Sequence, residues 1–491
     1  MKFSWKTLLP VLVTVLLLAL PAPQGLQLYA WRYFALFAGV VAGIILEPLP
    51  GGAVGLLGVT VAAMFSRFLL FSPQELSRTG FDASGASIAW ALSGFSNGTV
   101  WLIFAAFMFS LGYARTGLGA RVALLLVRAM GRKTILLGYS VMLADALLAP
   151  FTPSVTARSA GTIYPIISHL PLLYGSKPND PSAKRIGTYI LWVAVASTAI
   201  TSSLFLTALA PNLLAMEIVR STVHLQFTWT QWFFAAAPMG LLLLLLTPAV
   251  AFWICRPEVT SGDAVPRWAA EELKCMGPVS RAEKILIALV VLALLLWIGG
   301  GSFIDPTVAA LGVIVLMLIT RVLSWEEMLK NAAAWNTLVW FATLVALAAG
   351  LGKVGFIHWF AASVAHSVSG VPPLAAMLIL LALFFFSHYA FASITAHATA
   401  ILPVILALAL SIPGIPMASF ALLLCLMLGI MGVITPYASG PNPVYYGSGY
   451  LPSSTFWRLG GIFGLLYFAV YMALTVPWVL LAGPRLFLPH P

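Results

Sequence analysis

Two short polar segments interrupt long apolar stretches of the chain, and their side chains suit the binding of a small anion. The first is TPSVTAR at residues 152–158, and the second is SITAHAT at residues 393–399. A helix that begins directly after each segment directs its free N–H groups and the positive end of its dipole toward that segment. Hydroxyl groups add further donors, so the pattern predicts carboxylate binding by Ser154, Thr156, Thr395 and Thr399.

Ionisable side chains are few at these segments. Asp145 and Arg158 lie on either side of Phe151, so we expect them to face each other as a structural ion pair. His397 is the only ionisable residue of the second segment, and it is a candidate substrate contact, a proton-linked switch or a neutral packing residue. His388, in SHYAF, is interpreted as a packing residue.

A Pro-Asn pair marks an interrupted helix in each half of the chain. The first is APN at residues 210–212, and the second is the region from TP at 435–436 to GPN at 440–442. Proline breaks a helix, and an asparagine next to it either caps the freed end or offers its amide to a substrate. We therefore add Asn212, Thr435 and Asn442 to the predicted substrate site.

The elements that position these residues must lie in a membrane. Of the 491 residues, 61% are hydrophobic and 8% are charged, whereas about 25% are charged in an average soluble domain. Segments such as 187–218, 232–255 and 457–482 are long enough to cross the bilayer. The composition predicts an all-α membrane protein with about 11 transmembrane helices, the first of them an uncleaved helix within residues 1–27.

Several other function classes are disfavoured. The net charge of +11 is spread through loops, with no basic run interleaved with aromatics, so no nucleic-acid partner is expected. Neither HExxH nor GxSxG occurs, and Cys255, Cys275 and Cys425 lack metal-ligand spacing. We expect no enzyme, no metal site and no cofactor.

The order of elements in the first half recurs in the second. SNGTVW at 96–101 corresponds to WNTLVW at 335–340. Each is followed by an apolar hairpin with a polar tip and then by an interrupted helix. The predicted units are N-terminal helices at 1–87, repeats at 88–255 and 334–482, a cytoplasmic loop at 256–284 and further helices at 285–321, with re-entrant hairpins at 134–168 and 373–413.

Charge supports an inverted arrangement of the two repeats. Most of the 25 Lys and Arg residues fall on one side if the N-terminus is cytoplasmic and the C-terminus periplasmic. This requires the first hairpin to return to the side from which it came and the second to enter from the opposite side. Inverted repeats with broken helices predict a transporter whose site lies near the midplane.

The longest distinctive passages are LLAPFTPSVTARSAGTIYPII, PNDPSAKRIGTYI, ALAPNLLA, ASITAHATAILPV and ITPYASGPNPVYYGSGYLP. On these passages the chain resembles the divalent anion/sodium symporter superfamily, in its branch of citrate/succinate and tartrate/succinate antiporters and plastid 2-oxoglutarate/malate translocators. The likeness covers nearly the whole chain.

The resemblance implies an elevator-type transporter that works as a homodimer, with a scaffold that includes residues 29–71 and 285–321, and a Ser-Asn-Thr motif at each tip. Here Ser154 and Thr156 match the first motif, whereas Val155 replaces its asparagine. The second motif falls on Ala396, His397 and Ala398. Losing both asparagines disfavours two intact sodium sites.

The sequence therefore predicts an exchanger of small di- or tricarboxylate anions in a bacterial inner membrane. The candidate anions are tartrate, citrate, 2-oxoglutarate or malate, exchanged for a succinate-like anion. A sodium- or proton-coupled dicarboxylate symporter of the same fold is the alternative.

Overall fold

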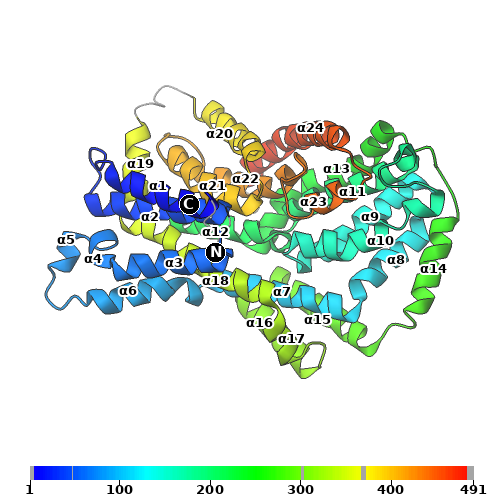
Figure 1. The fold of residues 1–491 in the computed structure, drawn as a ribbon, viewed down its shortest axis with the longest axis horizontal. Coiled ribbons are helices and arrows are strands. Elements are labelled where there is room, and N and C mark those ends of the chain that lie inside the picture. The colour runs from blue at the N-terminus through cyan, green and yellow to red at the C-terminus, as the bar shows by residue number, and fades with distance from the viewer. Residues whose placement is uncertain (1–4, 47, 300–302, 366–371, 484–491) are drawn as a thin grey trace.

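The computed structural model describes residues 5–46, 48–299, 303–365 and 372–483, and the chain in these ranges is helical (Figure 1). No β-strand occurs within them, and one isolated bridge joins Lys133 to Ser261. Nine of the described helices are long and apolar enough to cross a membrane. The all-α class is therefore confirmed, whereas the figure of about 11 crossings stays a prediction.

The helices follow one another with short connections. In the first half they are α1 (Trp5–Ala19), α2 (Leu28–Leu46), α3 (Gly51–Met64), α4 (Ser66–Leu69), α5 (Pro73–Leu76), α6 (Ala83–Leu92), α7 (Gly98–Thr116), α8 (Leu118–Met130), α9 (Thr134–Leu148), α10 (Tyr164–Ile167), α11 (Gly187–Leu204), α12 (Ala210–Val223) and α13 (Trp229–Cys255). In the second half they are α14 (Ala264–Cys275), α15 (Arg281–Gly299), α16 (Pro306–Ile319), α17 (Trp325–Lys330), α18 (Ala332–Lys353), α19 (Phe356–Ala365), α20 (Pro373–Ser387), α21 (Ile394–Leu410), α22 (Met417–Ile430), α23 (Asn442–Tyr446), α24 (Ser453–Val470) and α25 (Val476–Leu481).

One group of helices is built on close contact between α3 and α18. Gly52 and Gly55 of α3 face α18 so closely that an added side chain would collide with Asn336 and Thr343. Small residues allow such an approach between membrane helices. Tyr33 of α2 adds a buried hydrogen bond, 2.7 Å long, to a carbonyl of α18. Helices α7, α15 and α16 pack against one another beside this group.

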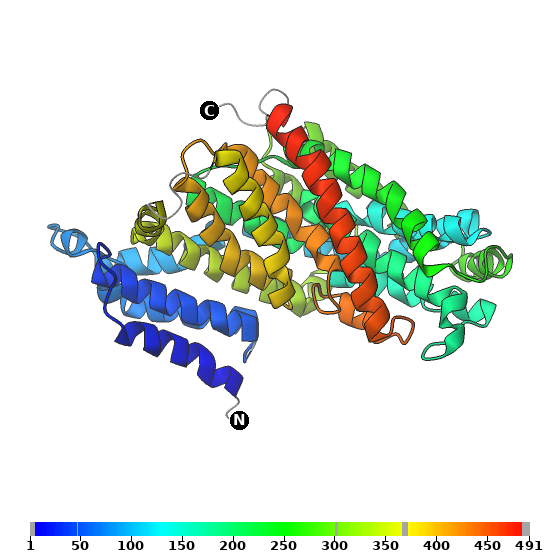
Figure 2. The same cartoon turned by 90° about the horizontal axis from the view of Figure 1, so that it is seen from above.

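A second group surrounds α11, whose residues from Gly187 to Leu204 are all buried. Helices α9, α13 and α22 pack on α11, and α12 packs on α21. In Figure 2, α1 and α2 lie at the left, whereas α13 and the long α24 cross the right-hand half. Since α11 is enclosed by protein, its polar side chains are surrounded by protein rather than by lipid.

Each half contains a helix, a polar tip and a second helix. In the first half these are α9, a short 3-10 turn at Ala149–Phe151, and a π-helix at Thr156–Ile163 that continues into α10. In the second half they are α20, a 3-10 turn at His388–Ala390, and α21. The segments Thr134–Phe151 and Pro373–Ala390 are each long enough to span a membrane, so re-entry of the two hairpins stays a prediction.

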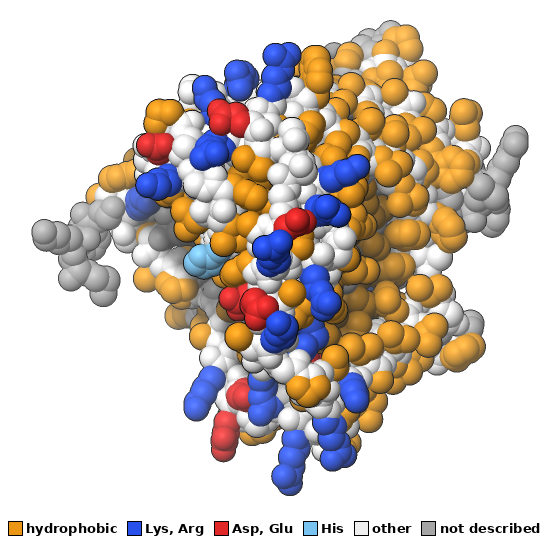
Figure 3. Space-filling view, turned by 90° about the vertical axis from the view of Figure 1, so that its right-hand side faces the viewer, with side chains coloured by type: hydrophobic (Ala, Val, Ile, Leu, Met, Phe, Trp, Pro, Cys, Tyr) orange, Lys and Arg blue, Asp and Glu red, His pale blue; other side chains and the backbone are white. Residues whose placement is uncertain are grey.

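Basic side chains gather at one end of the molecule. Figure 3 shows Lys and Arg spread over the end that carries α14, beside a broad hydrophobic flank. Exposed residues there include Arg267 and Lys274 on α14, and Arg132 and Lys133 before α9. This arrangement fits a cytoplasmic end next to a lipid-facing side, and the orientation itself remains a prediction.

Candidate functional site

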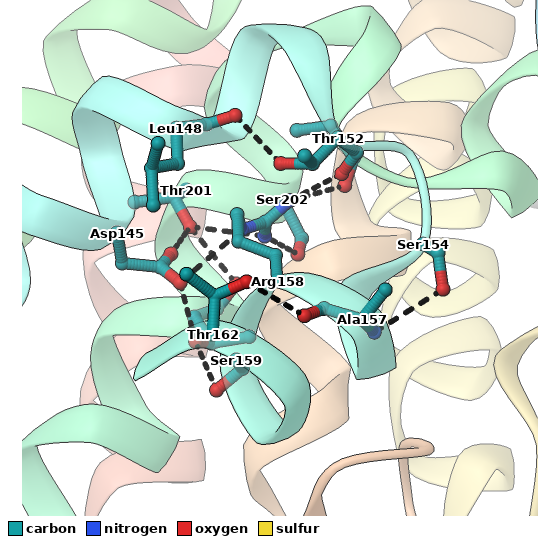
Figure 4. Close-up of polar contacts among 12 residues, drawn as sticks. Asp145, Leu148, Thr152, Ser154, Ala157, Arg158, Ser159, Thr162, Thr201 and Ser202 are labelled. Carbon is teal, nitrogen blue, oxygen red and sulfur yellow. Dashed lines mark hydrogen bonds and ion pairs between the residues drawn. The ribbon is translucent and has the colours of Figure 1, made fainter. Parts of the chain in front are cut away.

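The first tip leaves hydroxyl groups near its surface. Thr156 is exposed, whereas Ser154 and Val155 are half-buried. Ser154 accepts a hydrogen bond from the backbone N–H of Ala157, and its carbonyl accepts one from Arg158 (Figure 4). The π-helix begins at Thr156, and π-helical turns occur frequently at functional sites.

The polar groups around the first tip and the first break are called the first half-site, and those around the second tip and the second break the second half-site. Arg158 is fully buried and lies at the centre of the first half-site. A guanidinium has five N–H donors, and Arg158 uses its nitrogens in five interactions with oxygen atoms (Figure 4). Nε donates to the carboxylate of Asp145 at 3.1 Å. The remaining acceptors are the carbonyls of Thr152 at 2.7 Å and Ala208 at 2.8 Å, and the hydroxyls of Ser202 at 3.1 Å and Thr201 at 3.4 Å. The ion pair expected from the sequence is present.

Asp145 is held by more than its arginine. Thr198 donates to one carboxylate oxygen at 3.0 Å, and Thr201 donates to the other through a short hydrogen bond. Both threonines belong to α11, so the pair joins the first hairpin to this central helix. Sequence reasoning missed these partners, although the dense run of Ser and Thr at residues 197–203 is a signal that could have found them.

The two helix breaks are capped in the same way. Asn212 donates its amide to the carbonyls of Ser202 at 2.7 Å and Phe205 at 3.3 Å. Asn442 donates to Gly432 and Thr435, each at 2.8 Å. Both asparagines are buried, and their amide groups satisfy carbonyls that the breaks set free.

The oxygen atoms of the two asparagines differ. Ser439 donates to Oδ1 of Asn442 at 2.7 Å, whereas Oδ1 of Asn212 is buried without a partner in the described structure. The hydroxyl of Thr435 likewise lacks a partner there. Buried polar groups are normally paired, so these two atoms are candidates for contact with a substrate or with water.

His397 lies inside the second hairpin. Its ring is fully buried between Phe384, Phe391 and His388, with ring centroids 4.6, 5.0 and 5.0 Å away. Its Nε2 is 3.0 Å from Oγ of Ser387, and its Nδ1 has no partner among the described residues. Contact between His397 and a substrate stays a prediction, and Nδ1 is the atom left for it.

The two threonines of the second tip face different surroundings. Thr395 is half-buried, and its carbonyl accepts the Thr399 hydroxyl at 2.8 Å. Thr399 itself borders an apolar cavity of about 310 Å³ between α21, α2 and α19. Thr399 therefore lies on the side of the hairpin that meets the first group of helices, and Thr395 has the freer hydroxyl for a ligand.

The second break brings the two halves together. Gly440 lies against the hydroxyl of Thr156, and any side chain there would collide with it. Tyr445 shares a hydrogen bond of 2.9 Å with Ser159, whose hydroxyl oxygen also lies 2.9 Å from that of Thr198. Thus the first tip contacts both breaks, through Arg158 on one side and through Thr156 and Ser159 on the other.

The groups around the first tip suit a small anion. Within the described residues, no three His, Cys, Asp or Glu side chains gather as a metal site. The first tip instead presents neutral hydroxyl and amide donors beside a cation that its own carboxylate balances. Donors of this kind bind a carboxylate and still release it, because no unpaired charge holds the anion.

Comparisons with known proteins show the family of the chain. A family model described as the sodium:sulfate symporter transmembrane region matches residues 1–483. The L-tartrate/succinate antiporters of Escherichia coli (strain K12) and Shigella sonnei (strain Ss046) are each 47% identical over 475 residues, which cover 97% of this chain and 98% of theirs.

A solved structure shares the fold. The YdaH transporter of Alcanivorax borkumensis superposes with a TM-score of 0.57 at 17% sequence identity, covering 88% of this chain and 98% of that one. At this level of identity the likeness concerns the fold alone.

Proposed function

Because the chain belongs to the sodium:sulfate symporter family of membrane transporters, we propose that it exchanges small dicarboxylate anions, tartrate-like on one side and succinate-like on the other. The antiporter names of relatives 47% identical over nearly the full length support both the substrate class and the exchange mode. Citrate, malate and 2-oxoglutarate are further candidates of the same chemistry.

The observation that carries the exchange mode is the setting of Arg158. Carbonyl, hydroxyl and carboxylate oxygens converge on its guanidinium, and such a set of oxygen ligands also suits a hard metal cation. Here the cation is covalently attached and cannot leave. The first hairpin is therefore held to the first break at any sodium concentration, which favours exchange without a sodium gradient.

Proton coupling is the second candidate. Nδ1 of His388 and Nδ1 of His397 are buried without partners among the described residues, and an unpaired imidazole nitrogen can accept a proton. This candidate shares the substrate class and differs in the driving force.

Movement of the site is proposed to follow the elevator scheme. The proposed scaffold consists of the first 87 residues and the helices at 285–321, packed with α7 and α18; the moving part contains both hairpins and both broken helices. The cavity between α2, α19 and α21 supports sliding at this boundary, since every residue that lines it except Thr399 is apolar. We further propose a homodimer in a bacterial inner membrane, with the N-terminus cytoplasmic and the C-terminus periplasmic.

Purified protein in liposomes tests the proposal. Labelled succinate should enter vesicles loaded with tartrate or succinate, and it should not accumulate in empty vesicles. Adding an inward sodium gradient should leave both results unchanged. Sodium-driven uptake into empty vesicles would show sodium symport, and uptake driven only by an inward proton gradient would show the second candidate.

A further inference from the structure

We propose that His388 is a positioning residue for the second half of the substrate site, where it binds the backbone carbonyl equivalent to the one that Arg158 binds in the first half. The inference rests on the proposed function for the meaning of the site, and on hydrogen-bond geometry for the role. His388 was expected from the sequence to be a packing residue.

The two breaks can be aligned through their asparagines. Asn212 and Asn442 each donate to carbonyls ten and seven residues earlier in the chain. This shared pattern makes Ser202 equivalent to Gly432, and Phe205 equivalent to Thr435. In the same alignment Ala208 and Ala438 are equivalent, each lying four residues before its asparagine.

Both of these alanine carbonyls accept a hydrogen bond from a buried basic side chain of their own hairpin. Arg158 donates to Ala208 at 2.8 Å, and Nε2 of His388 contacts the oxygen of Ala438 at 2.9 Å. Both side chains have an exposed fraction of 0%. Arg158 follows its tip whereas His388 precedes its own, so aligning the two hairpin sequences would not pair them.

The tautomer of His388 follows from its hydrogen-bond partner. A carbonyl can only accept, so Nε2 of His388 must carry the hydrogen. The ring of His388 thus donates through Nε2 and keeps Nδ1 as an acceptor. Nε2 of His397 lies 3.0 Å from the hydroxyl of Ser387, which also lies 3.0 Å from the carbonyl of Phe384. His388 needs only one N–H for the proposed role.

The carbonyl that His388 holds belongs to the segment that completes the site. Ala438 is fully buried two residues before Gly440, which lies against Thr156. Tyr437 adds a weaker link to the same hairpin by donating to the carbonyl of Tyr389 at 3.1 Å. Losing the His388 donor leaves a buried carbonyl unpaired, and the segment is then free to shift away from the second tip.

Substitutions that keep or remove the donor test the proposal. The amide of glutamine reaches the position of Nε2, so His388→Gln should stay within about twofold of the original protein in KM for succinate exchange. His388→Leu lacks a donor and should raise KM about tenfold. If the leucine variant does not fold, His388→Asn replaces it, because its shorter amide cannot reach Ala438. His358→Gln, on the exposed surface of α19, is the matched control.

A distance measurement separates this proposal from the transport assignment. Spin labels at exposed Ala392 and Val444 report the spacing between the second tip and the segment after the break. A narrow distribution is expected with His388 or Gln, and a broader one with Leu or Asn. Identical behaviour of the Gln and Leu variants in both KM and distance would overturn the proposal. Absence of succinate exchange by the unmodified protein would overturn the proposed function and leave the distance result to decide the role of His388.

Discussion

The two repeats secure their hairpins with different chemistry. In the first, a buried guanidinium spreads five interactions over the tip, the break and a carboxylate, and two threonines of α11 support that carboxylate. In the second, two imidazoles lie among aromatic rings, and each leaves Nδ1 without a partner in the described structure. No carboxylate is among the partners found for either imidazole.

This difference separates a rigid half-site from an adaptable one. Breaking a buried ion pair is strongly unfavourable, so the first tip should keep its geometry through the transport cycle. The second tip is held by neutral hydrogen bonds, each contributing about 1 kcal/mol. We infer that the second tip adjusts to different anions while the first provides a fixed frame.

The largest expected effect is the loss of the buried carboxylate. Asp145→Asn leaves the guanidinium of Arg158 without a counter-ion and should lower the free energy of unfolding by about 3 to 5 kcal/mol. Thermal unfolding in detergent, or the yield of folded protein, measures the loss. Asp263→Asn removes an exposed partner of Arg132 and should change stability by about 0 to 1 kcal/mol. Equal stability of the two variants would erase the contrast between the half-sites.

A side chain at Gly440 should disturb the meeting of the two halves. Gly440→Ala places a methyl group against the Thr156 hydroxyl, and overpacking of this kind costs about 1 to 3 kcal/mol. Succinate exchange should weaken, with KM rising about tenfold if the cost falls on binding. Gly461→Ala is the control, because nothing lies near the added methyl group. Normal exchange by Gly440→Ala would show that transport does not depend on the close contact between Gly440 and Thr156.

Removing one hydroxyl group tests the link between the repeats. Tyr445→Phe deletes the hydrogen bond to Ser159 and should lower the free energy of unfolding by about 0.5 to 1.5 kcal/mol. Tyr446→Phe changes an exposed neighbour and should have little effect. Thermal unfolding of the two variants, compared side by side, is the measurement. If the two melting curves coincide, the hydroxyl of Tyr445 does not stabilise the contact between the repeats.

The smallest effect is expected at Val155. Val155→Asn adds a side-chain amide to the first tip, yet the carbonyls of Thr152 and Ala208 remain bound to the guanidinium of Arg158. Exchange by this variant should remain independent of sodium, with KM changed by no more than about threefold. Sodium titration of succinate exchange is the measurement. A sodium requirement created by this one substitution would mean that the guanidinium does not exclude the ion.

Much of the architecture could be predicted from local sequence signals. Apolar length predicts the helices, prolines and small polar residues predict the tips, and the Pro-Asn pairs predict the two breaks. The Asp145–Arg158 ion pair could be predicted because its two residues flank one turn. Asn212 and Asn442 were predicted either to cap freed helix ends or to offer their amides to a substrate. Both amides donate to carbonyls at the breaks, and substrate contact by these residues stays a prediction.

Contacts between segments far apart in the sequence could not be predicted in the same way. Tyr445 and Ser159 are 286 residues apart, and no local pattern marks their hydrogen bond. The aromatic surroundings of His397 depend on how α20 folds back on α21, so the sequence left open whether its ring faces a substrate or the protein. Substrate contacts by the hydroxyls of Ser154, Thr156 and Thr395 also remain predictions.

Simultaneous measurement of two fluxes tests the central claim most directly. Vesicles in sodium-free buffer, loaded with labelled tartrate and placed in differently labelled succinate, report entry and exit together. The fixed guanidinium at the first tip predicts that one succinate enters for each tartrate that leaves, at a rate that sodium does not change. Net succinate entry without tartrate exit, or exchange that begins only when sodium is added, would contradict the account.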